Sequence, residues 1–258
     1  MCVQLVEIKF NDRYHIIGAE IRNYLLEKSR IVVPNQFERN YHLFYQLCAG
    51  ASESERARWC LDHAGKFRIL SVGGCLEVDG TDDAEEWATL RSALDILAFS
   101  AAEVDDIMRT TAACLHLGNI DFTQNQRDEA AVSSATADAV QTAAALLRVD
   151  VHALTTSLIS QRKQMGRESI LTVRSRVLAE AARDALTKKI YSNLFDWLIA
   201  RVNKTLGAKS KDSNKQVSVL DIFGQMHGPN SSSPCAGWLV SVVIDLLFAF
   251  KQQRCCFH

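Results

Sequence analysis

A four-residue motif, Asp221-Ile-Phe-Gly224, has the residue types that the phosphates of a nucleotide would need beside them. It closes an apolar run, Val217–Ile222, for which we predict a fully buried strand. A carboxylate at the end of a strand can orient a magnesium ion through its water shell. A glycine amide can approach a terminal phosphate because no Cβ obstructs it. Strand–Asp–Gly turns are also frequent in proteins without such a ligand, so a purely structural turn remains the alternative.

Positive charge gathers in a second candidate segment, from Gln161 to Arg176. Five basic residues and one acid give it a local charge of +4: Arg162, Lys163, Arg167, Arg174 and Arg176, against Glu168. Charge concentrated on one loop of a neutral protein steers an acidic partner toward that loop. From composition alone, a solvated surface loop is an equally good interpretation.

Three other kinds of chemistry lack the residues that they need. The seven histidines are scattered without an HxxxH pair, and no His or Cys has the spacing of a zinc site, so we expect His42 and His116 to be capping or hydrogen-bonded core residues. No GxSxG nucleophile motif occurs. Gly65-Lys66 is followed by Phe67 and lacks the preceding glycine, so it does not form a phosphate-binding GxxxxGK[ST] loop.

The composition is that of an ordinary globular chain of 258 residues, with 48% hydrophobic and 23% charged residues. Twenty-nine Lys and Arg against 30 Asp and Glu give a net charge of −1, which excludes a general attraction to nucleic acid or to an anionic membrane. The eight cysteines form no CxxC pair, and Met1–Phe10 has no secretory signal pattern. We therefore expect reduced thiols and a cytoplasmic protein.

The elements that must position both candidate segments are mainly α-helices with a few β-strands. The alternation in Val6–Ile17 predicts a β-hairpin that turns at Asn11-Asp12, with a bulge at Leu5-Val6, and a short amphipathic segment follows at Ile21–Lys28. Apolar spacing and Ser-x-x-Glu capping boxes predict the helices Phe37–Ala49, Ser52–Leu61, Trp87–Leu97, Ser100–Gly118, Thr136–Leu147 and Ser175–Leu206.

The last 34 residues, Gln225–His258, differ from the rest of the chain. They contain three charged residues, whereas Met1–Gly224 contains 56. The run Trp238–Phe250 would span about 20 Å as a helix, against roughly 30 Å of bilayer hydrocarbon, and Asp245 lies within it, so we expect no transmembrane span. An unspliced intron, a frameshift and an alternative end are the interpretations that remain open for this segment.

Five runs of residues together have the order and spacing of one protein family: Leu25–Arg30 with Glu38–Tyr45, Ala112–Ile120, Asp184–Tyr191, Leu194–Asn203 and Leu220–Gly224. They resemble the motor head of a myosin over nearly all of Val3–Gly224. The resemblance implies the upper (50-kDa) subdomain region of a P-loop NTPase motor. It divides the chain into a partial motor domain, residues 1–224, and a divergent segment, residues 225–258.

The resemblance gives each candidate segment a role. Asp221 would help to hold the magnesium water shell and the Gly224 amide would contact the γ-phosphate, which makes ATP with Mg²⁺ the implied cofactor. The loop from Gln161 to about Thr172 takes the place of an actin-contacting hairpin, so the implied actin-binding residues are Arg162, Lys163, Arg167 and Glu168. Glu168 lies sixteen residues before Asp184, where myosins carry an acid or a phosphorylatable hydroxyl. A fixed acid there implies competence for actin without heavy-chain phosphorylation.

The family pattern is incomplete in this sequence. The phosphate loop and the switch-one residues are expected before Val3, and Gln225 and Met226 stand where the switch-two Glu is expected. We therefore expect part of an ATP-dependent actin motor of the cytoskeleton that has no ATPase activity of its own and that meets light chains or calmodulin only through other regions. The alternative is a non-enzymatic actin-binding or regulatory helical protein derived from a myosin head.

Overall fold

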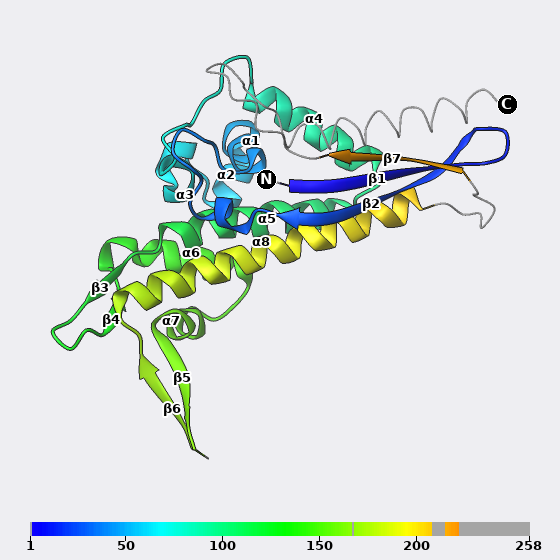
Figure 1. Ribbon diagram of the computed structural model, residues 1–258. Helices are drawn as coiled ribbons and strands as arrows, with labels where there is room; N and C mark the ends of the chain where they lie inside the picture. The colour runs from blue at the N-terminus through cyan, green and yellow to red at the C-terminus, as the bar shows by residue number, and fades with distance from the viewer. Residues whose placement is uncertain (1, 167, 208–214, 222–258) are drawn as a thin grey trace. The chain divides into compact units, whose positions relative to one another are not determined.

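The computed structural model describes residues 2–166, 168–207 and 215–221 (Figure 1). The chain forms two compact units. Unit 1 comprises residues 1–27, 77–104 and 192–258, and unit 2 comprises residues 28–76 and 105–191. Two long helices, α5 (Ala101–Asn119) and α8 (Arg176–Leu206), have residues in both units. The mainly helical fold with a few strands agrees with the prediction.

Unit 1 contains an antiparallel sheet of three strands in the order β2 (Ile16–Leu26), β1 (Cys2–Phe10) and β7 (Lys215–Asp221). The predicted hairpin is confirmed, and the Asn11 side chain forms its turn by accepting hydrogen bonds from the amides of Arg13 and His15, at 3.0 and 2.9 Å. The predicted amphipathic segment Ile21–Lys28 is largely the second half of β2.

The bulge predicted at Leu5-Val6 is wrong. The register of β1 against β2 shifts between Val3 and Gln4 and between Lys9 and Phe10 instead. Leu5 and Val6 are adjacent apolar residues in a regular strand because successive side chains point to opposite faces of a sheet. Val6 is buried and Leu5 is half-buried, so each face of the sheet is covered to some extent at this point.

Strand β7 was predicted to be fully buried, and that prediction is wrong for its described residues. Val217, Val219 and Leu220 are 54%, 36% and 48% exposed. Within residues 2–166, 168–207 and 215–221, β7 pairs only with β1 and stands at the end of the strand order. A mainly apolar run does not distinguish a central strand from an edge strand, since both can carry such side chains.

The helices of unit 1 are α4 (Asp83–Ile96), the start of α5 and the second half of α8. Ser100 and Glu103 form the predicted capping box at the start of α5, with each backbone amide bonded to the other side chain. Near the end of α8, the Asn203 amide accepts from the Ile21 N–H and donates to the Ile21 carbonyl, both at 2.8 Å. One side chain thus ties α8 to the outer edge of β2.

Unit 2 contains the remaining helices, three short 3₁₀ turns and two hairpins. They are η1 (Lys28–Ile31), α1 (His42–Gly50), α2 (Glu53–Trp59), η2 (Ala64–Lys66), α3 (Arg68–Ser71), β3 (Phe122–Gln124), β4 (Ala130–Val132), η3 (Ser134–Thr136), α6 (Ala137–Leu147), α7 (Val151–Ile159), β5 (Ser160–Met165) and β6 (Glu168–Val173).

Two helix boundaries in unit 2 differ from the prediction. Helix α1 begins at His42 rather than Phe37, because Phe37 is left-handed (φ 65°) and the buried Asn40 side chain bonds the carbonyls of Ile31 and Ile69. Helix α2 opens with the predicted capping box at Ser52 but ends at Trp59, because Cys60 is left-handed (φ 52°).

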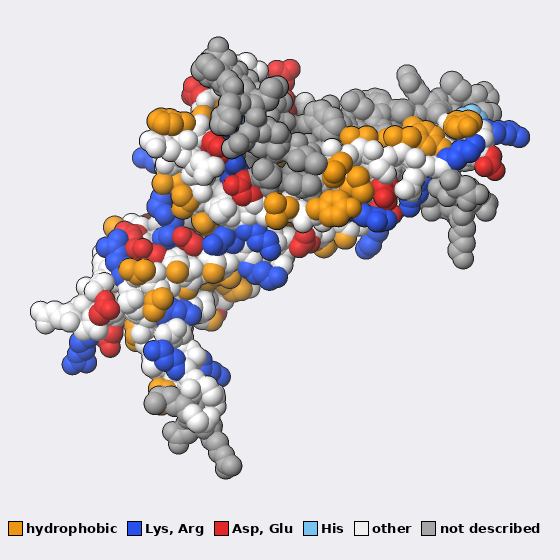
Figure 2. Space-filling view, viewed as in Figure 1, with side chains coloured by type: hydrophobic (Ala, Val, Ile, Leu, Met, Phe, Trp, Pro, Cys, Tyr) orange, Lys and Arg blue, Asp and Glu red, His pale blue; other side chains and the backbone are white. Residues whose placement is uncertain are grey.

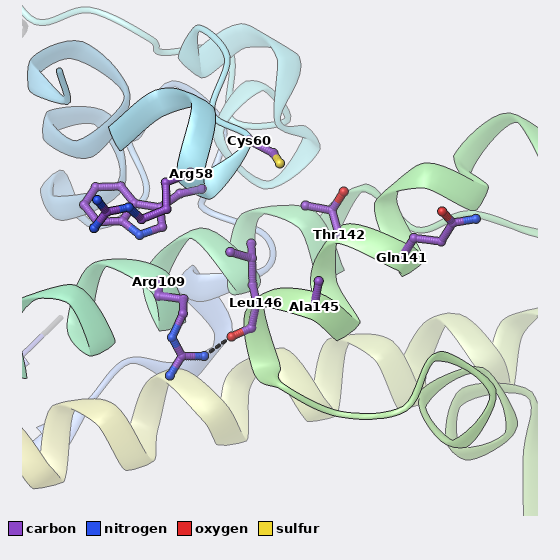
Figure 3. A pocket seen from close by; sticks show the side chains of 8 residues that line it. Arg58, Cys60, Arg109, Gln141, Thr142, Ala145 and Leu146 are labelled. Carbon is purple, nitrogen blue, oxygen red and sulfur yellow. Dashed lines mark hydrogen bonds between the residues drawn. The ribbon is translucent and has the colours of Figure 1, made fainter. Parts of the chain in front are cut away.

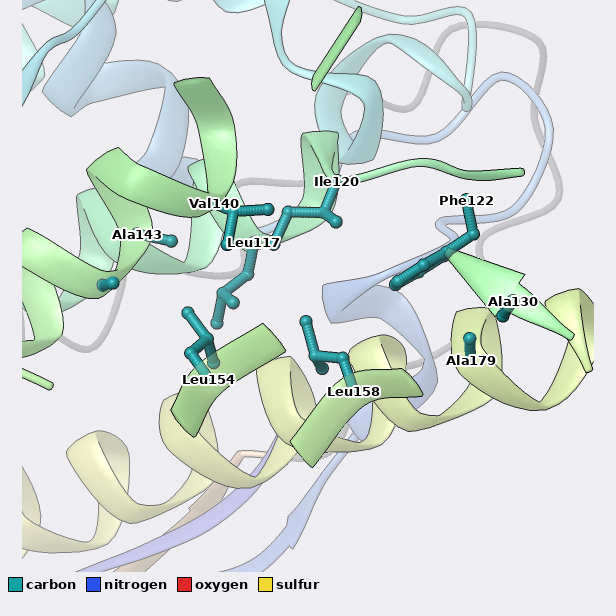
Figure 4. Packing of buried hydrophobic residues seen from close by; sticks show 10 residues of the cluster. Leu117, Ile120, Phe122, Ala130, Val140, Ala143, Leu154, Leu158 and Ala179 are labelled. Atoms are coloured by element: carbon teal, nitrogen blue, oxygen red, sulfur yellow. The ribbon is translucent and has the colours of Figure 1, made fainter. Parts of the chain in front are cut away.

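A hydrophobic cluster in unit 2 joins six helices and strands (Figure 4). Its fully buried members come from α5, β3, β4, α6, α7 and α8: Leu117, Ile120, Phe122, Ala130, Val140, Ala143, Ala144, Leu154, Leu158 and Ala179. Leu154 and Leu158 anchor α7 in this cluster, one turn apart on the same helix face. The cluster therefore fixes the base from which the β5–β6 hairpin begins.

No helix in the described part of the chain is long and apolar enough to cross a bilayer. The run Trp238–Phe250 lies outside the described residues. The four cysteines whose side chains are described, Cys48, Cys60, Cys75 and Cys114, form no disulfide with one another. Burial raises the pKa of the Cys114 thiol to about 12, so this thiol is inert.

Candidate functional site

The basic segment predicted as a loop folds into the β5–β6 hairpin of unit 2. Six residue pairs form its ladder, from Ser160 opposite Val173 to Met165 opposite Glu168. Gly166 sits in the turn with φ 61°, a conformation that glycine adopts without steric cost. Figure 1 shows the hairpin as a narrow ribbon that projects from the ends of α7 and α8.

Arg174 fixes the base of this hairpin. Its guanidinium donates from Nη1 to the carbonyls of Ser157 and Leu158, at 2.6 and 2.8 Å, and its amide donates to the Ile159 carbonyl at 2.7 Å. These are carbonyls of the last turn of α7, which have no partner within the helix. The Arg174 carbonyl in turn accepts from Ala130, which ties the hairpin to β4.

The +4 charge of the segment is therefore not all available to a partner. Besides Arg174, Arg176 is used within the fold, because it pairs with Glu180 at 2.8 Å and with Asp121 at 3.5 Å. The basic residues described on the free part of the hairpin are Arg162 and Lys163, both exposed. Arg167 lies outside the described residues, and for Glu168 only the backbone, at the start of β6, is described.

The hairpin also exposes apolar side chains, which charge counting missed. Leu171 lies opposite Arg162 and is 59% exposed, and Ile170 lies opposite Lys163 and is 42% exposed. The sequence signal for this strand was the run Ser169–Val173, because β-branched and apolar residues favour a β-strand. The space-filling view shows Lys and Arg side chains along the projecting hairpin (Figure 2). Mixed basic and apolar surface of this kind is typical of a protein-binding site.

The other candidate segment, the motif Asp221–Gly224, has only its first residue among the described residues. Asp221 is the last residue of β7 and lies opposite Gln4 of β1, and Gly224 falls outside the described residues. No group of three or more His, Cys, Asp or Glu in the described part of the chain could hold a metal ion. One carboxylate at the end of a strand does not fit the donor set of a magnesium–nucleotide site on its own, and no catalytic step follows from it.

Comparison with known proteins places these two segments in one family. The family model for the myosin head (motor domain) matches residues 4–231, which include the hairpin and the Asp221–Gly224 motif. The chain belongs to the myosin head family.

Over the aligned residues, known myosins are more than one third identical to this chain. Myosin-1 of Arabidopsis thaliana is 38% identical over 221 residues, and the Myosin ID heavy chain of Dictyostelium discoideum is 38% identical over 226 residues. Myosin-7 of Arabidopsis thaliana is 40% identical over 223 residues. These matches cover 85–86% of this chain but only 13–20% of each relative, so the chain spans at most a fifth of their length.

Two of the runs that carry the myosin resemblance lie largely in the core of unit 2. In the run Ala112–Ile120, every apolar residue is buried, and a Cβ added at Gly118 would lie 2.5 Å from Ile69 Cγ2. In the run Glu38–Tyr45, the Arg39 guanidinium lies 3.8 Å from the centre of the Tyr45 ring. In these two runs, the residues typical of the family are therefore explained by close packing in the core.

His116, in the run Ala112–Ile120, is a buried core histidine, as predicted. Its Nε2 lies 3.2 Å from the Trp59 carbonyl, and its ring meets the edge of Phe67 at a centroid distance of 5.5 Å. Burial lowers the pKa of His116, so the neutral ring is favoured. His42 opens α1 and lies in no metal-binding group of the described residues.

Proposed function

We propose that this chain is part of the upper (50-kDa) subdomain region of an ATP-dependent actin motor, and that its β5–β6 hairpin contacts actin filaments. The observation that carries the proposal is the projecting ribbon on which Arg162 and Lys163 are exposed beside Ile170 and Leu171. The charges would steer the filament to the hairpin, and the apolar side chains would supply contact area after docking. The proposal implies an association with the cytoskeleton.

Co-sedimentation with actin filaments tests the role of the hairpin. We expect Arg162→Gln/Lys163→Gln to weaken binding about tenfold at low ionic strength, with a smaller loss at high salt, because screening weakens exposed charges. The matched control is Arg13→Gln/Lys28→Gln, which removes one exposed Arg and one exposed Lys outside the hairpin. Equal affinities for the two double variants would rule out the hairpin as the contact.

Glu168 has a regulatory role in this proposal. The acid stands at the start of β6, at the tip of the hairpin ladder, where it pairs with Met165. A permanent negative charge there would make the hairpin competent for actin without phosphorylation. In a complete motor that carries this sequence, Glu168→Ala should lower actin-activated ATPase, and Glu168→Asp should retain it. Unchanged activity in the alanine variant would refute this role.

We further propose that Asp221 and Gly224 lie on the nucleotide side of the complete motor, with Asp221 acting on magnesium through bound water. The resemblance and the position of Asp221 at the end of β7 support this. Since the described residues offer a single carboxylate there, we expect the 258-residue chain to hydrolyse no MgATP, with or without actin filaments. Filament binding without turnover fits the proposal, whereas turnover above the rate of a boiled sample contradicts it.

A further inference from the structure

A pocket of about 390 Å³ in unit 2 has two arginines on its wall, and the fold uses both of them (Figure 3). Arg109 donates to the Leu146 carbonyl and, at 2.8 Å, to Asp106. Arg58 pairs with Asp105 at 3.0 Å. The pocket therefore offers a partner little charge that the fold has not already used, whereas the β5–β6 hairpin carries exposed basic side chains.

The hairpin has two faces of different composition, which the register of its strands defines. Residues opposite each other in an antiparallel ladder share a face, and successive residues alternate between the two faces. One face, the outer face, carries Arg162, Leu171 and Val173 together with the polar residues Ser160, Gln164 and Ser169. The other, the inner face, carries Lys163 and Ile170 together with Gln161 and Thr172.

The inner face is turned toward the rest of unit 2 at the base of the hairpin, beside α7 (Figure 1). Ile159 and Arg174 continue the alternation on this face, and the Arg174 amide donates to the Ile159 carbonyl at 2.7 Å. The Ile159 side chain packs against the hydrophobic cluster, and the Arg174 guanidinium reaches the end of α7. Unit 2 therefore obstructs a large partner that approaches the base of the inner face.

The outer face is accessible at the base of the hairpin as well as near its tip. Val173, at the base, is 45% exposed, and Leu171, next to it on this face, is 59% exposed. Arg162 lies opposite Leu171, so a basic and an aliphatic side chain are neighbours there. Arginine is enriched in protein interfaces relative to the rest of the surface, whereas lysine is depleted. The outer face thus combines the accessibility and the composition of a contact surface.

We propose that the hairpin docks on actin filaments through its outer face, with Leu171 and Val173 as apolar contacts and Arg162 as the charged contact. The assignment rests on the proposed function, since the actin contact is itself a proposal. Lys163, on the inner face, would add to long-range steering and would stay solvated in the docked state. Two basic residues that are adjacent in sequence would thus have different roles.

Two double variants, each lacking one basic and one aliphatic residue, compare the faces by co-sedimentation of the 258-residue chain with actin filaments. Arg162→Gln/Leu171→Thr alters the outer face, and Lys163→Gln/Ile170→Thr makes matched changes on the inner face. Threonine favours a strand, so both variants should keep the hairpin. We expect the outer-face variant to weaken binding about thirtyfold and the inner-face variant about threefold, since a charge outside the contact changes mainly the association rate.

The outcomes separate the assignment to one face from the actin contact itself. Equal losses in the two variants, or a larger loss in the inner-face variant, would overturn the assignment and leave the hairpin as the contact. Wild-type affinity in both variants, or no binding by the wild-type chain, would refute the contact and the assignment together.

Hydroxyl-radical footprinting of the wild-type chain on filaments needs no variant. Tandem mass spectrometry measures the oxidation of Leu171 and of Ile170 separately. We expect filament binding to lower the oxidation of Leu171 about fivefold and that of Ile170 by less than about twofold, because only the outer face becomes buried. Equal protection of the two side chains would overturn the assignment, even where a variant failed to fold.

Discussion

The carboxylate of Glu103 shows how one side chain can serve two elements. It accepts from the Ser100 amide at 2.8 Å, which closes the capping box of α5, and from Arg201 Nε at 2.8 Å, which ties α5 to the second half of α8. The hydrogen bond from Arg201, followed by that from the Ser100 backbone, lowers the pKa of Glu103 from 4.5 to about 2. The ionised form is therefore part of the folded structure.

This pKa predicts a pH dependence with a definite sign. Because the folded pKa lies below the unfolded one, the contribution of Glu103 to stability is present above about pH 4.5 and is lost as the pH falls toward 2. Arg201→Gln should move the pKa of Glu103 back toward 4.5 and flatten the acid limb of stability between these values. Side-chain carboxyl NMR titration measures the pKa, and a value still near 2 in the variant would contradict the assignment to Arg201.

Gly118 gives a second prediction at the scale of one residue. An added Cβ would lie 2.5 Å from Ile69 Cγ2, which is closer than side chains tolerate. We expect Gly118→Ala to destabilise the chain by about 1–3 kcal/mol, even though alanine is the better helix former by about 1 kcal/mol. Chemical denaturation measures the loss. In a double-mutant cycle with Ile69→Ala, additive losses would show that the two side chains do not meet.

Among the elements, the two helices that open with a capping box have the predicted starts, and α5 also ends within one residue of the predicted Gly118, whereas α2 ends before the predicted Leu61. Ser52 with Glu55 and Ser100 with Glu103 mark helix starts because each pair satisfies amides locally. The spacing gives no signal for the left-handed Cys60 that ends α2, and the Asn40 contact that delays α1 is made to the Ile69 carbonyl, which is distant in sequence. The β5–β6 hairpin, in contrast, had a signal in the run Ser169–Val173, which the count of charges did not use.

Arg174 therefore carries the prediction for the hairpin as an element. Arg174→Met keeps the length of the side chain and removes its two hydrogen bonds to the end of α7. We expect the β5–β6 amides to lose protection from hydrogen exchange by about ten- to a hundredfold, since bonds from charged donors contribute about 1.5–3 kcal/mol each. Lys163→Met, on the free part of the ribbon, is the control. Equal protection in both variants would mean that Arg174 does not hold the base.

At the scale of the whole molecule, neither the net charge of −1 nor the apolar pattern of the sequence predicts which side chains are exposed. Charge counting identified the hairpin but also included Arg174 and Arg176, which the fold uses internally. The apolar pattern identified β7 but did not reveal that Val217, Val219 and Leu220 are exposed at the end of the described sheet. Such exposure is a property of strand order, and strand order is set by tertiary structure.

The exposed strand predicts self-association. An edge strand with apolar side chains on both faces is a template for pairing with another chain. We expect Val219→Lys to raise the monomer fraction of the 258-residue chain in size-exclusion chromatography with light scattering. Val177→Lys, at a 71% exposed position on α8, is the control and should have little effect. The same monomer fraction in both variants would mean that β7 is not the contact.

The side-chain amide of Asn203 blocks strand addition at one edge of the sheet. At Ile21, it already occupies the N–H and the carbonyl that a further strand would need beside β2. A chain that approached this side would have to break two formed hydrogen bonds to make two new ones, which yields little net gain. At β7, within the described residues, no such exchange is needed. Association through this sheet should therefore stop at two chains that pair β7 to β7, because each of them then presents only its capped β2 edge.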